Sequence, residues 1–256
     1  MVIVNAPLPL GGNNMRLRVF LIIGIVALLA VGFRDNIGLF YHRQISDPRT
    51  VRNYFSTHRI RKLQLGAGGG YVQDWLNSDI EPTANEIYLD AMGDYPFENG
   101  SFQYIFAEHL IEHLPWEGGL KMLKECYRVL APGGKLRIIT PNIAVYFYAM
   151  SNQTDPKMQE FIRANERIFR WPQTPVGGAY VFNKEVREWG HVFVYDPPTL
   201  RRALELAGFT SIRELRVGEK TDPVFEAAEY RTHQFGEDVW LANSVGSMAF
   251  EADKKP

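Results

Sequence analysis

The stretch "LQLGAGGGYVQDWLNSDI", from Leu63 to Ile80, decides the fold. Its small residues 66–70 follow a short apolar run, and Asp79 comes 13 positions after the first glycine. Glycine lets the backbone turn sharply and approach a ligand with no Cβ in the way. A carboxylate that ends the next apolar run has enough lone pairs to accept from both hydroxyls of a ribose. The stretch therefore indicates a site for a nucleoside-containing cofactor, and a plain glycine turn is the alternative.

A dinucleotide fits this stretch less well. The Gly-x-Gly-x-x-Gly fingerprint ends in glycine and is followed by an acid about 20 residues further on. Here Tyr71 stands at the last glycine position, and Asp79 comes early at the end of a predicted strand. The pattern thus favours a nucleoside without clear evidence for a pyrophosphate.

Strand-like and helix-like segments alternate on both sides of this stretch. A short helix is predicted near 47–57, a longer one over about 117–130, and a turn at "APGG", residues 131–134. The strand-like runs lie at 62–67, 75–80, 86–91, 102–109 and 135–142. This alternation predicts βαβ units and a mainly parallel sheet, in which ligands bind at the carboxyl ends of the strands. Residues 210–250 are expected to add the last antiparallel strands, "SIRELRV" and "WLANSVGSMAF".

Composition limits what the chain can do. Its 256 residues are 46% apolar, enough for one core with appendages. A net charge of −1 gives no general field for nucleic acid, so no nucleic-acid partner is expected. Cys126 is the only cysteine, which excludes an intrachain disulfide and a thiolate metal cluster.

Four blocks of the sequence, in this order, resemble the class I S-adenosylmethionine-dependent methyltransferases of the type-11 kind. They are "LQLGAGG", "NSDI", "LDAMGDYPFENGSFQYIFAEHLIEHL" and "LKECYRVLAPGGKLRIITPN", within residues 62–142. A looser resemblance continues over "GHVFVYDPPTLRRALELAGF", residues 190–209. The resemblance implies an α/β fold: a Rossmann-like, seven-stranded, mostly parallel sheet with helices on both faces and an antiparallel last strand. It implies a methyltransferase that uses S-adenosyl-L-methionine.

The resemblance also assigns site residues. The glycine loop would pass under the methionine part of the cofactor, Asp79 would bind the ribose, and Asp90 would accept from the adenine amino group. Gln64 and Gln103 stand where the family usually has acids. Gln64 can still hydrogen-bond a charged amine through its carbonyl, but the attraction is weaker than that of a carboxylate. The positions that match the family's cofactor site are Gln64, Gly66, Ala67, Gly68, Asp79, Ile80, Asp90, Ala91 and Glu108.

A sulfonium methyl is already activated, so positioning of donor and acceptor supplies much of the rate. A base is needed only if the acceptor must lose a proton, and the candidates are His109, His113 and His191. The expected acceptor is a small molecule, a lipid or a glycan. The aromatic-rich segment of about 146–189 is interpreted as a helical insertion, either packed as core or serving as a lid over the acceptor.

Two other functions remain open. The departures at Gln64 and Gln103, with no obvious base, fit a non-catalytic module that binds S-adenosylmethionine. "HLIEH", residues 109–113, matches the His-x-x-Glu-His pattern of zinc hydrolases, with Glu112 as base and Glu185 or Glu188 as a third ligand. In the methyltransferase interpretation no metal is required, and Glu112 and His113 lie near an exposed rim.

The N-terminal region carries an apolar segment. Val19–Phe33 is fifteen residues without a charge, preceded by Arg16 and Arg18 and followed by Arg34. As a helix it would span roughly 22 Å, against about 30 Å for a bilayer core. A single membrane anchor with snorkelling arginines, a signal peptide and a buried core helix are all compatible with it.

We expect residues 1–45 to form a tail with a hydrophobic anchor helix, and residues 46–256 to form the methyltransferase domain. A cleaved signal peptide would send the domain where the methyl donor is scarce. The expected location is therefore the membrane, through 19–33, with the catalytic domain in the cytoplasm. A soluble cytoplasmic protein is the alternative.

Overall fold

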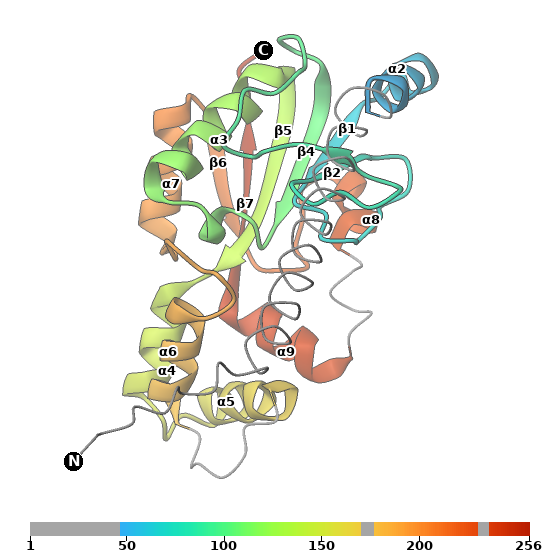
Figure 1. Cartoon of the computed structure of the whole chain (residues 1–256). Helices are drawn as coiled ribbons and strands as arrows, with labels where there is room; N and C mark the ends of the chain where they lie inside the picture. The colour runs from blue at the N-terminus through green and yellow to red at the C-terminus, as the bar shows by residue number, and fades with distance from the viewer. Residues whose placement is uncertain (1–46, 170–176, 230–235) are drawn as a thin grey trace, which may run out of the picture.

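The computed structural model describes residues 47–169, 177–229 and 236–256 (Figure 1). The predicted anchor Val19–Phe33 lies outside these residues, so it stays a prediction. Within the described ranges no helix combines the length and the apolar character needed to cross a bilayer.

A seven-stranded sheet forms the centre, in the order β3-β2-β1-β4-β5-β7-β6. Its neighbours pair in parallel from β3 to β5, and β7 runs antiparallel to both β5 and β6. This confirms the predicted Rossmann-like fold with its antiparallel last strand. The strands are β1 Lys62–Leu65, β2 Leu76–Asp79, β3 Ile87–Tyr88, β4 Phe102–Glu108, β5 Leu130–Pro141, β6 Thr210–Leu215 and β7 Ser247–Asp253.

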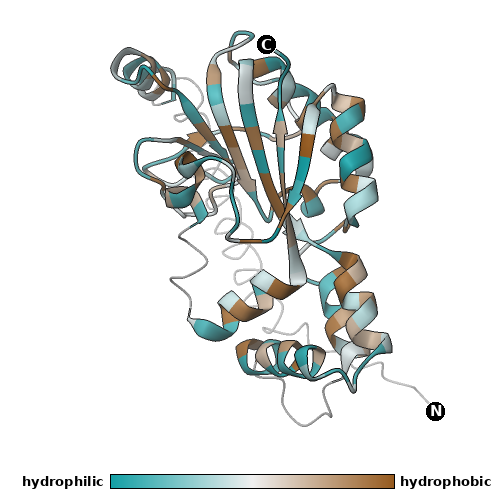
Figure 2. Cartoon of the chain, turned by 180° about the vertical axis from the view of Figure 1, so that it is seen from behind, coloured by the Kyte–Doolittle hydropathy of each residue, from teal (hydrophilic) through white to brown (hydrophobic). Residues whose placement is uncertain are grey.

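Helices cover both faces of the sheet (Figure 2), and the buried apolar residues come from the strands and from the helices and loops around them. On one face, α3 (Trp116–Val129) and α7 (Pro197–Ala207) pack over the main core. On the other face, the turn η3 (Pro223–Phe225) and α8 (Glu226–Glu229) cover a smaller cluster around Phe106 and Phe225. Helix α2 (Asp47–Thr57), the first helix of the described residues, lies against the β3 edge, where Asp47 accepts from the backbone of Tyr88.

Two predicted elements differ from the structure. "APGG" does not precede the fifth strand as a separate turn; it is an irregularity inside β5, between the pairs Phe102–Leu130 and Tyr104–Lys135. The first half of "WLANSVGSMAF" was wrongly predicted as strand. It belongs to α9 (Glu237–Gly246), whose first turn carries Glu237 and Asp238, acids that stabilise a helix start.

The aromatic-rich segment forms helices, as predicted. They are α4 (Ile143–Ser151), α5 (Pro156–Phe169) and α6 (Gly178–Arg187), and together with α9 they lie beyond the carboxyl ends of the strands (Figure 1). They have a core of their own, in which Tyr146 and Phe161 are buried edge to face. The helices therefore stand where a lid or an acceptor wall would be.

The close approach of α4 and α6 depends on Gly178. A Cβ there would lie 2.4 Å from the carbonyl oxygen of Ala149 and 2.5 Å from the Cα of Met150. Because both atoms belong to the backbone, neither can move alone. We expect Gly178→Ala to lower the free energy of unfolding by about 1–3 kcal/mol in urea titrations. Gly177→Ala is the control, since its Cβ meets only the end of the Gln153 side chain; equal losses would contradict this packing.

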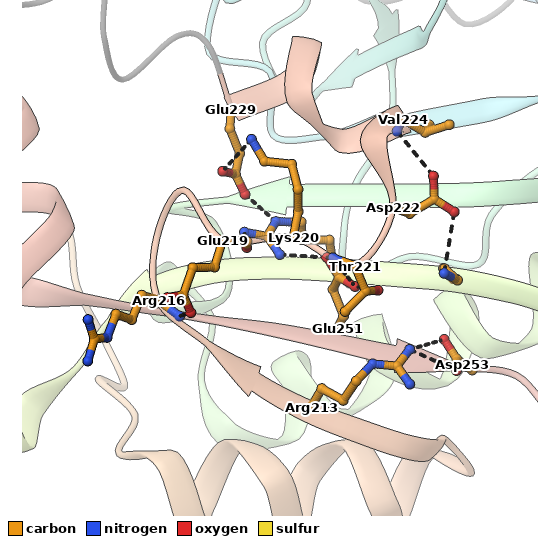
Figure 3. A network of polar contacts seen from close by, with 12 residues as sticks. Arg213, Arg216, Glu219, Lys220, Thr221, Asp222, Val224, Glu229, Glu251 and Asp253 are labelled. Atoms are coloured by element: carbon orange, nitrogen blue, oxygen red, sulfur yellow. Dashed lines mark hydrogen bonds and ion pairs between the residues drawn. The ribbon is translucent and has the colours of Figure 1, made fainter.

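A buried ionic network links β5 to the C-terminal elements α8 and β7. Arg137 on β5 is fully buried and donates to Glu229, to Glu251 at 2.7 Å and to the carbonyl of Glu219 at 2.7 Å. Figure 3 shows Lys220 and Thr221 pointing toward these carboxylates from the loop after β6. The guanidinium thereby joins β5, β7 and α8 by charge-assisted hydrogen bonds.

Candidate functional site

The glycine loop and Asp79 lie together at the carboxyl ends of β1 and β2. The Asp79 carboxylate accepts from the backbone N–H of Gly68 at 2.8 Å and from that of Glu81 at 2.9 Å. A carboxylate has about four acceptor positions, so it retains capacity for two hydroxyls. The structure thus brings together the two features on which the nucleoside prediction depends.

The loop has the backbone that only glycine adopts easily. Gly66, Gly68 and Gly69 all have positive φ, between 55° and 75°. A Cβ on Gly66 would lie 2.9 Å from Leu110, whereas a Cβ on Gly69 would meet no atom within 4 Å. Open space beside Gly69 leaves its backbone approachable from outside, as a ligand-binding bend requires.

Two side chains beside the loop are not satisfied by the surrounding protein. Gln64 is buried, and its Oε1 has no hydrogen-bond partner among the described residues. Ile80, next to Asp79, keeps 53% of its surface exposed although it is apolar. A cofactor with an ammonium group and an adenine ring would supply a donor for Gln64 and an apolar face for Ile80. The residues therefore fit S-adenosylmethionine.

The other predicted cofactor residues lie at the ends of neighbouring strands. Asp90, after β3, accepts from the backbone of Met92 and lines a cavity of about 620 Å³ between α2 and β3. Ala91 beside it is buried. Glu108, the last residue of β4, lines a different cavity. The glycine loop and Asp79 line neither, so the predicted positions follow the sheet edge rather than one enclosed pocket.

The second cavity, of about 400 Å³, lies between the end of β4 and the helices α4, α5, α6 and α9. We call it the acceptor cavity, for the role that we propose for it. All three predicted histidines line it, together with residues that the sequence did not single out as a set. The walls include Glu108, His109, His113, Tyr146, Asn165, Phe169, Glu185, Trp189, His191, Asn243 and Ser247.

His109 is held as a hydrogen-bond donor. Its Nδ1 lies 3.0 Å from Oε1 of Glu112 and its Nε2 lies 2.8 Å from Oδ1 of Asn243. Desolvation disfavours the imidazolium, but the hydrogen bond and charge of Glu112 outweigh it and raise the pKa of His109 to about 9. A cation at neutral pH suits His109 to binding or positioning rather than to accepting a proton.

His191 differs from His109, because its surroundings favour the neutral imidazole. Its Nδ1 lies 2.5 Å from the carbonyl oxygen of Glu185, and burial lowers the pKa of His191. Since a carbonyl only accepts, Nδ1 carries the hydrogen and Nε2 carries the lone pair. Glu185 itself lines the cavity; burial raises the pKa of its carboxyl to about 7. His191 is thus a neutral imidazole with one basic nitrogen.

The His-x-x-Glu-His pattern does not form the expected helix. Residues 111–113 are one turn of 3₁₀ helix, and His109 precedes it with φ of 50°. His109 binds Glu112, so the two histidines do not share a helix face as metal ligands. The prediction of an exposed rim for Glu112 was also wrong: its side chain is fully buried and accepts from Thr140 at 3.0 Å. Although burial favours the neutral carboxyl, His109 holds the pKa of Glu112 below its ordinary value.

Sequence reasoning missed Tyr146, Asn243 and Thr140 as site residues, and it considered Glu185 only as a metal ligand. Each comes from a different element, and no motif links them. The one usable signal was positional, since Thr140 and Tyr146 flank the end of β5, where ligand sites of α/β sheets lie.

Residues 63–138 match the model of a methyltransferase domain family. Among curated proteins no relative matches the chain. Among solved structures, an S-adenosylmethionine-dependent methyltransferase from Archaeoglobus fulgidus is similar at 18% identity, over 82% of this chain and 92% of that one, with a TM-score of 0.44. A possible histamine N-methyltransferase from Thermotoga maritima is similar at 13% identity, over 84% and 98%, with a TM-score of 0.46. A phosphoethanolamine N-methyltransferase from Haemonchus contortus, in complex with S-adenosyl-L-methionine, is similar at 17% identity, over 83% and 53%, with a TM-score of 0.39.

Proposed function

We propose that this chain is a class I S-adenosylmethionine-dependent methyltransferase that methylates a small molecule bound in the acceptor cavity. The match of residues 63–138 to a methyltransferase domain family supports the proposal. The observation that carries the proposal is the position of Glu108. This residue ends β4 beside the predicted cofactor site, and it also lines the acceptor cavity. A donor and an acceptor on the two sides of Glu108 would lie next to each other.

The size and walls of the cavity favour a small molecule over a polymer. A volume of about 400 Å³ lies within the range of small-ligand pockets, roughly 300–1,000 Å³. Aromatic rings of Phe169 and Trp189, 4.9 Å apart, form one wall, and polar groups of Glu185 and His191 form another. Such a mixture binds an apolar body and orients a few polar atoms.

In this proposal the chain acts by positioning. Gly66–Gly68, Asp79 and Gln64 would hold the cofactor, which supplies a sulfonium methyl when bound. The acceptor walls then fix the attacking atom, and the helices around the cavity exclude water. Orientation alone contributes on the order of 7–11 kcal/mol to lowering such a barrier.

The test is transfer of labelled methyl groups. The purified full-length chain is incubated with S-adenosylmethionine labelled in its methyl group and, in separate reactions, with small metabolites, phospholipid vesicles and oligosaccharides. We expect label only in the small-molecule reactions. Label confined to lipid or oligosaccharide would contradict the proposed acceptor class, and no transfer to any of them would contradict methyl transfer from this site.

A substitution in the wall of the acceptor cavity distinguishes acceptor binding from cofactor binding. His191→Ala should lower kcat by about 10²-fold, because the acceptor loses a wall that orients it, while the affinity for S-adenosylmethionine stays unchanged. Val192→Ala is the matched control, since the Val192 side chain is 61% exposed. Steady-state kinetics and calorimetry measure both quantities. A loss of cofactor affinity equal to the loss of turnover would remove His191 from the acceptor side.

We also propose that residues 1–45 are a tail with a membrane anchor at 19–33, and that the methyltransferase domain faces the cytoplasm. The uncharged run with arginines at its ends supports this proposal. Expressed in its host, the full-length chain should sediment with membranes and resist extraction by carbonate. Recovery in the soluble fraction would favour the soluble alternative.

A further inference from the structure

Three side chains converge at one point, and two of them line the acceptor cavity. Glu112, His113 and His191 each offer one ligand atom, and these atoms all lie within 4.8 Å of one another. The rings of His113 and His191 meet edge to face with their centroids 4.9 Å apart. Two imidazoles and one carboxylate form a donor set that suits zinc and similar divalent transition metals.

The backbone fixes these side chains in place. The N–H groups of Val192 and Phe193 both donate to the carbonyl of Glu112, at 2.8 and 3.1 Å. These bonds tie the segment that carries His191 to the turn that carries Glu112 and His113. The convergence is therefore a product of the tertiary fold, since His191 is far from the other two in sequence.

Outer partners orient the ligands, as they do in known metal sites. The His191 Nδ1–H is taken by the Glu185 carbonyl, which leaves Nε2 as the ligating nitrogen. The carboxylate of Glu112 is oriented by Thr140 and by His109, whose other nitrogen contacts Asn243. Metal-binding histidines and carboxylates commonly have such second partners, which fix their tautomer and direction.

The cluster opens onto the acceptor cavity, which leaves room for an open coordination position. His113 and His191 line the acceptor cavity, and so do the carboxylates of Glu108 and Glu185. Three protein ligands beside a cavity leave room for a further ligand from solvent or from an acceptor, which is the arrangement of catalytic rather than structural zinc sites.

We propose that Glu112, His113 and His191 form a binding site for one divalent transition-metal ion of the zinc class, open to the acceptor cavity. This ligand set differs from the one that the His-x-x-Glu-His pattern predicts: His191 takes the place of His109, and Glu112 is a ligand rather than the base. Metal binding can be measured without any methyl transfer, so a failure of this proposal and a failure of the proposed function are distinguishable.

The test uses the full-length chain, stripped of metal with a chelator and titrated with Zn²⁺ by calorimetry and with Co²⁺ by visible absorption. We expect one ion per chain in the wild type. His113→Ala and His191→Ala should each weaken binding at least about tenfold, and His109→Ala should weaken it less than either. His58→Ala is the matched control, because His58 lies on α2's C-terminal side, stacked on Tyr54 and outside the cluster.

Circular dichroism shows whether each variant has kept its fold. X-ray absorption on the zinc-loaded wild type provides a readout that needs no variant, and it should show two imidazoles and a carboxylate oxygen. Absence of stoichiometric binding in the wild type would overturn the proposal. Binding unchanged in both His113→Ala and His191→Ala, or a zinc spectrum without imidazole, would overturn it as well.

Discussion

Arg137→Met should destabilise the fold by about 3–5 kcal/mol, because it leaves buried carboxylates without their counter-charge. Arg137 is fully buried, and its partners Glu229 and Glu251 are buried too. Burial already raises the pKa of Glu229, and the nearby positive charges of Arg137 and Lys220 oppose that rise. Without the guanidinium, the two acids would have to take up protons or open the packing of α8 and β7. Urea unfolding at pH 7 measures the loss.

Arg213→Met is the control for this prediction. Arg213 lies on the neighbouring strand β6 and contacts both carboxylate oxygens of Asp253 at 2.9 Å, but the pair is partly exposed. Such pairs contribute about 0–1 kcal/mol. Equal losses of unfolding free energy in the two variants would show that the buried network contributes no more to stability than an exposed ion pair.

Asp79→Ala should weaken binding of S-adenosylmethionine by about 1–3 kcal/mol, roughly 5- to 150-fold in Kd. The carboxylate would lose its hydrogen bonds to the ribose, and the loop would lose the bond that Asp79 accepts from Gly68. Both losses act on the same site, so the effect falls on cofactor affinity before it falls on global stability. Calorimetric titration of the full-length chain measures the change.

Glu81→Ala provides the comparison. Glu81 is exposed, and only its backbone N–H reaches Asp79, so the contact survives the substitution. Affinity in this variant should equal that of the wild type. If Asp79→Ala binds the cofactor as tightly as Glu81→Ala does, the sugar of the cofactor is held elsewhere.

The sheet could be predicted from the sequence because its signals are local. Short apolar runs such as 62–65 and 102–108 are followed by glycine or polar residues. These strand ends can be recognised without knowing which strands pair with which. The meeting of Gly68 and Asp79 follows from the same logic, since parallel strands bring their carboxyl ends to one edge. The ligand-binding roles of these residues stay predictions.

What could not be predicted depends on contacts distant in sequence. Trp240–Gly246 are apolar enough to suggest a strand, yet tertiary packing against α5 makes them a helix. The burial of Glu112 depends on contacts with Thr140 and with the backbone of Val192 and Phe193, and the pairing of Arg137 with Glu251 spans 114 positions. A motif scan finds "HLIEH" but cannot show that His191, rather than His109, joins His113 and Glu112.

The most direct measurement is a crystal structure of the full-length chain with S-adenosylhomocysteine bound. We expect both ribose hydroxyls within about 3 Å of the Asp79 carboxylate, with the amino-acid part of the ligand along Gly66–Gly68. A ligand bound away from this bend, with Asp79 facing only solvent, would contradict the account.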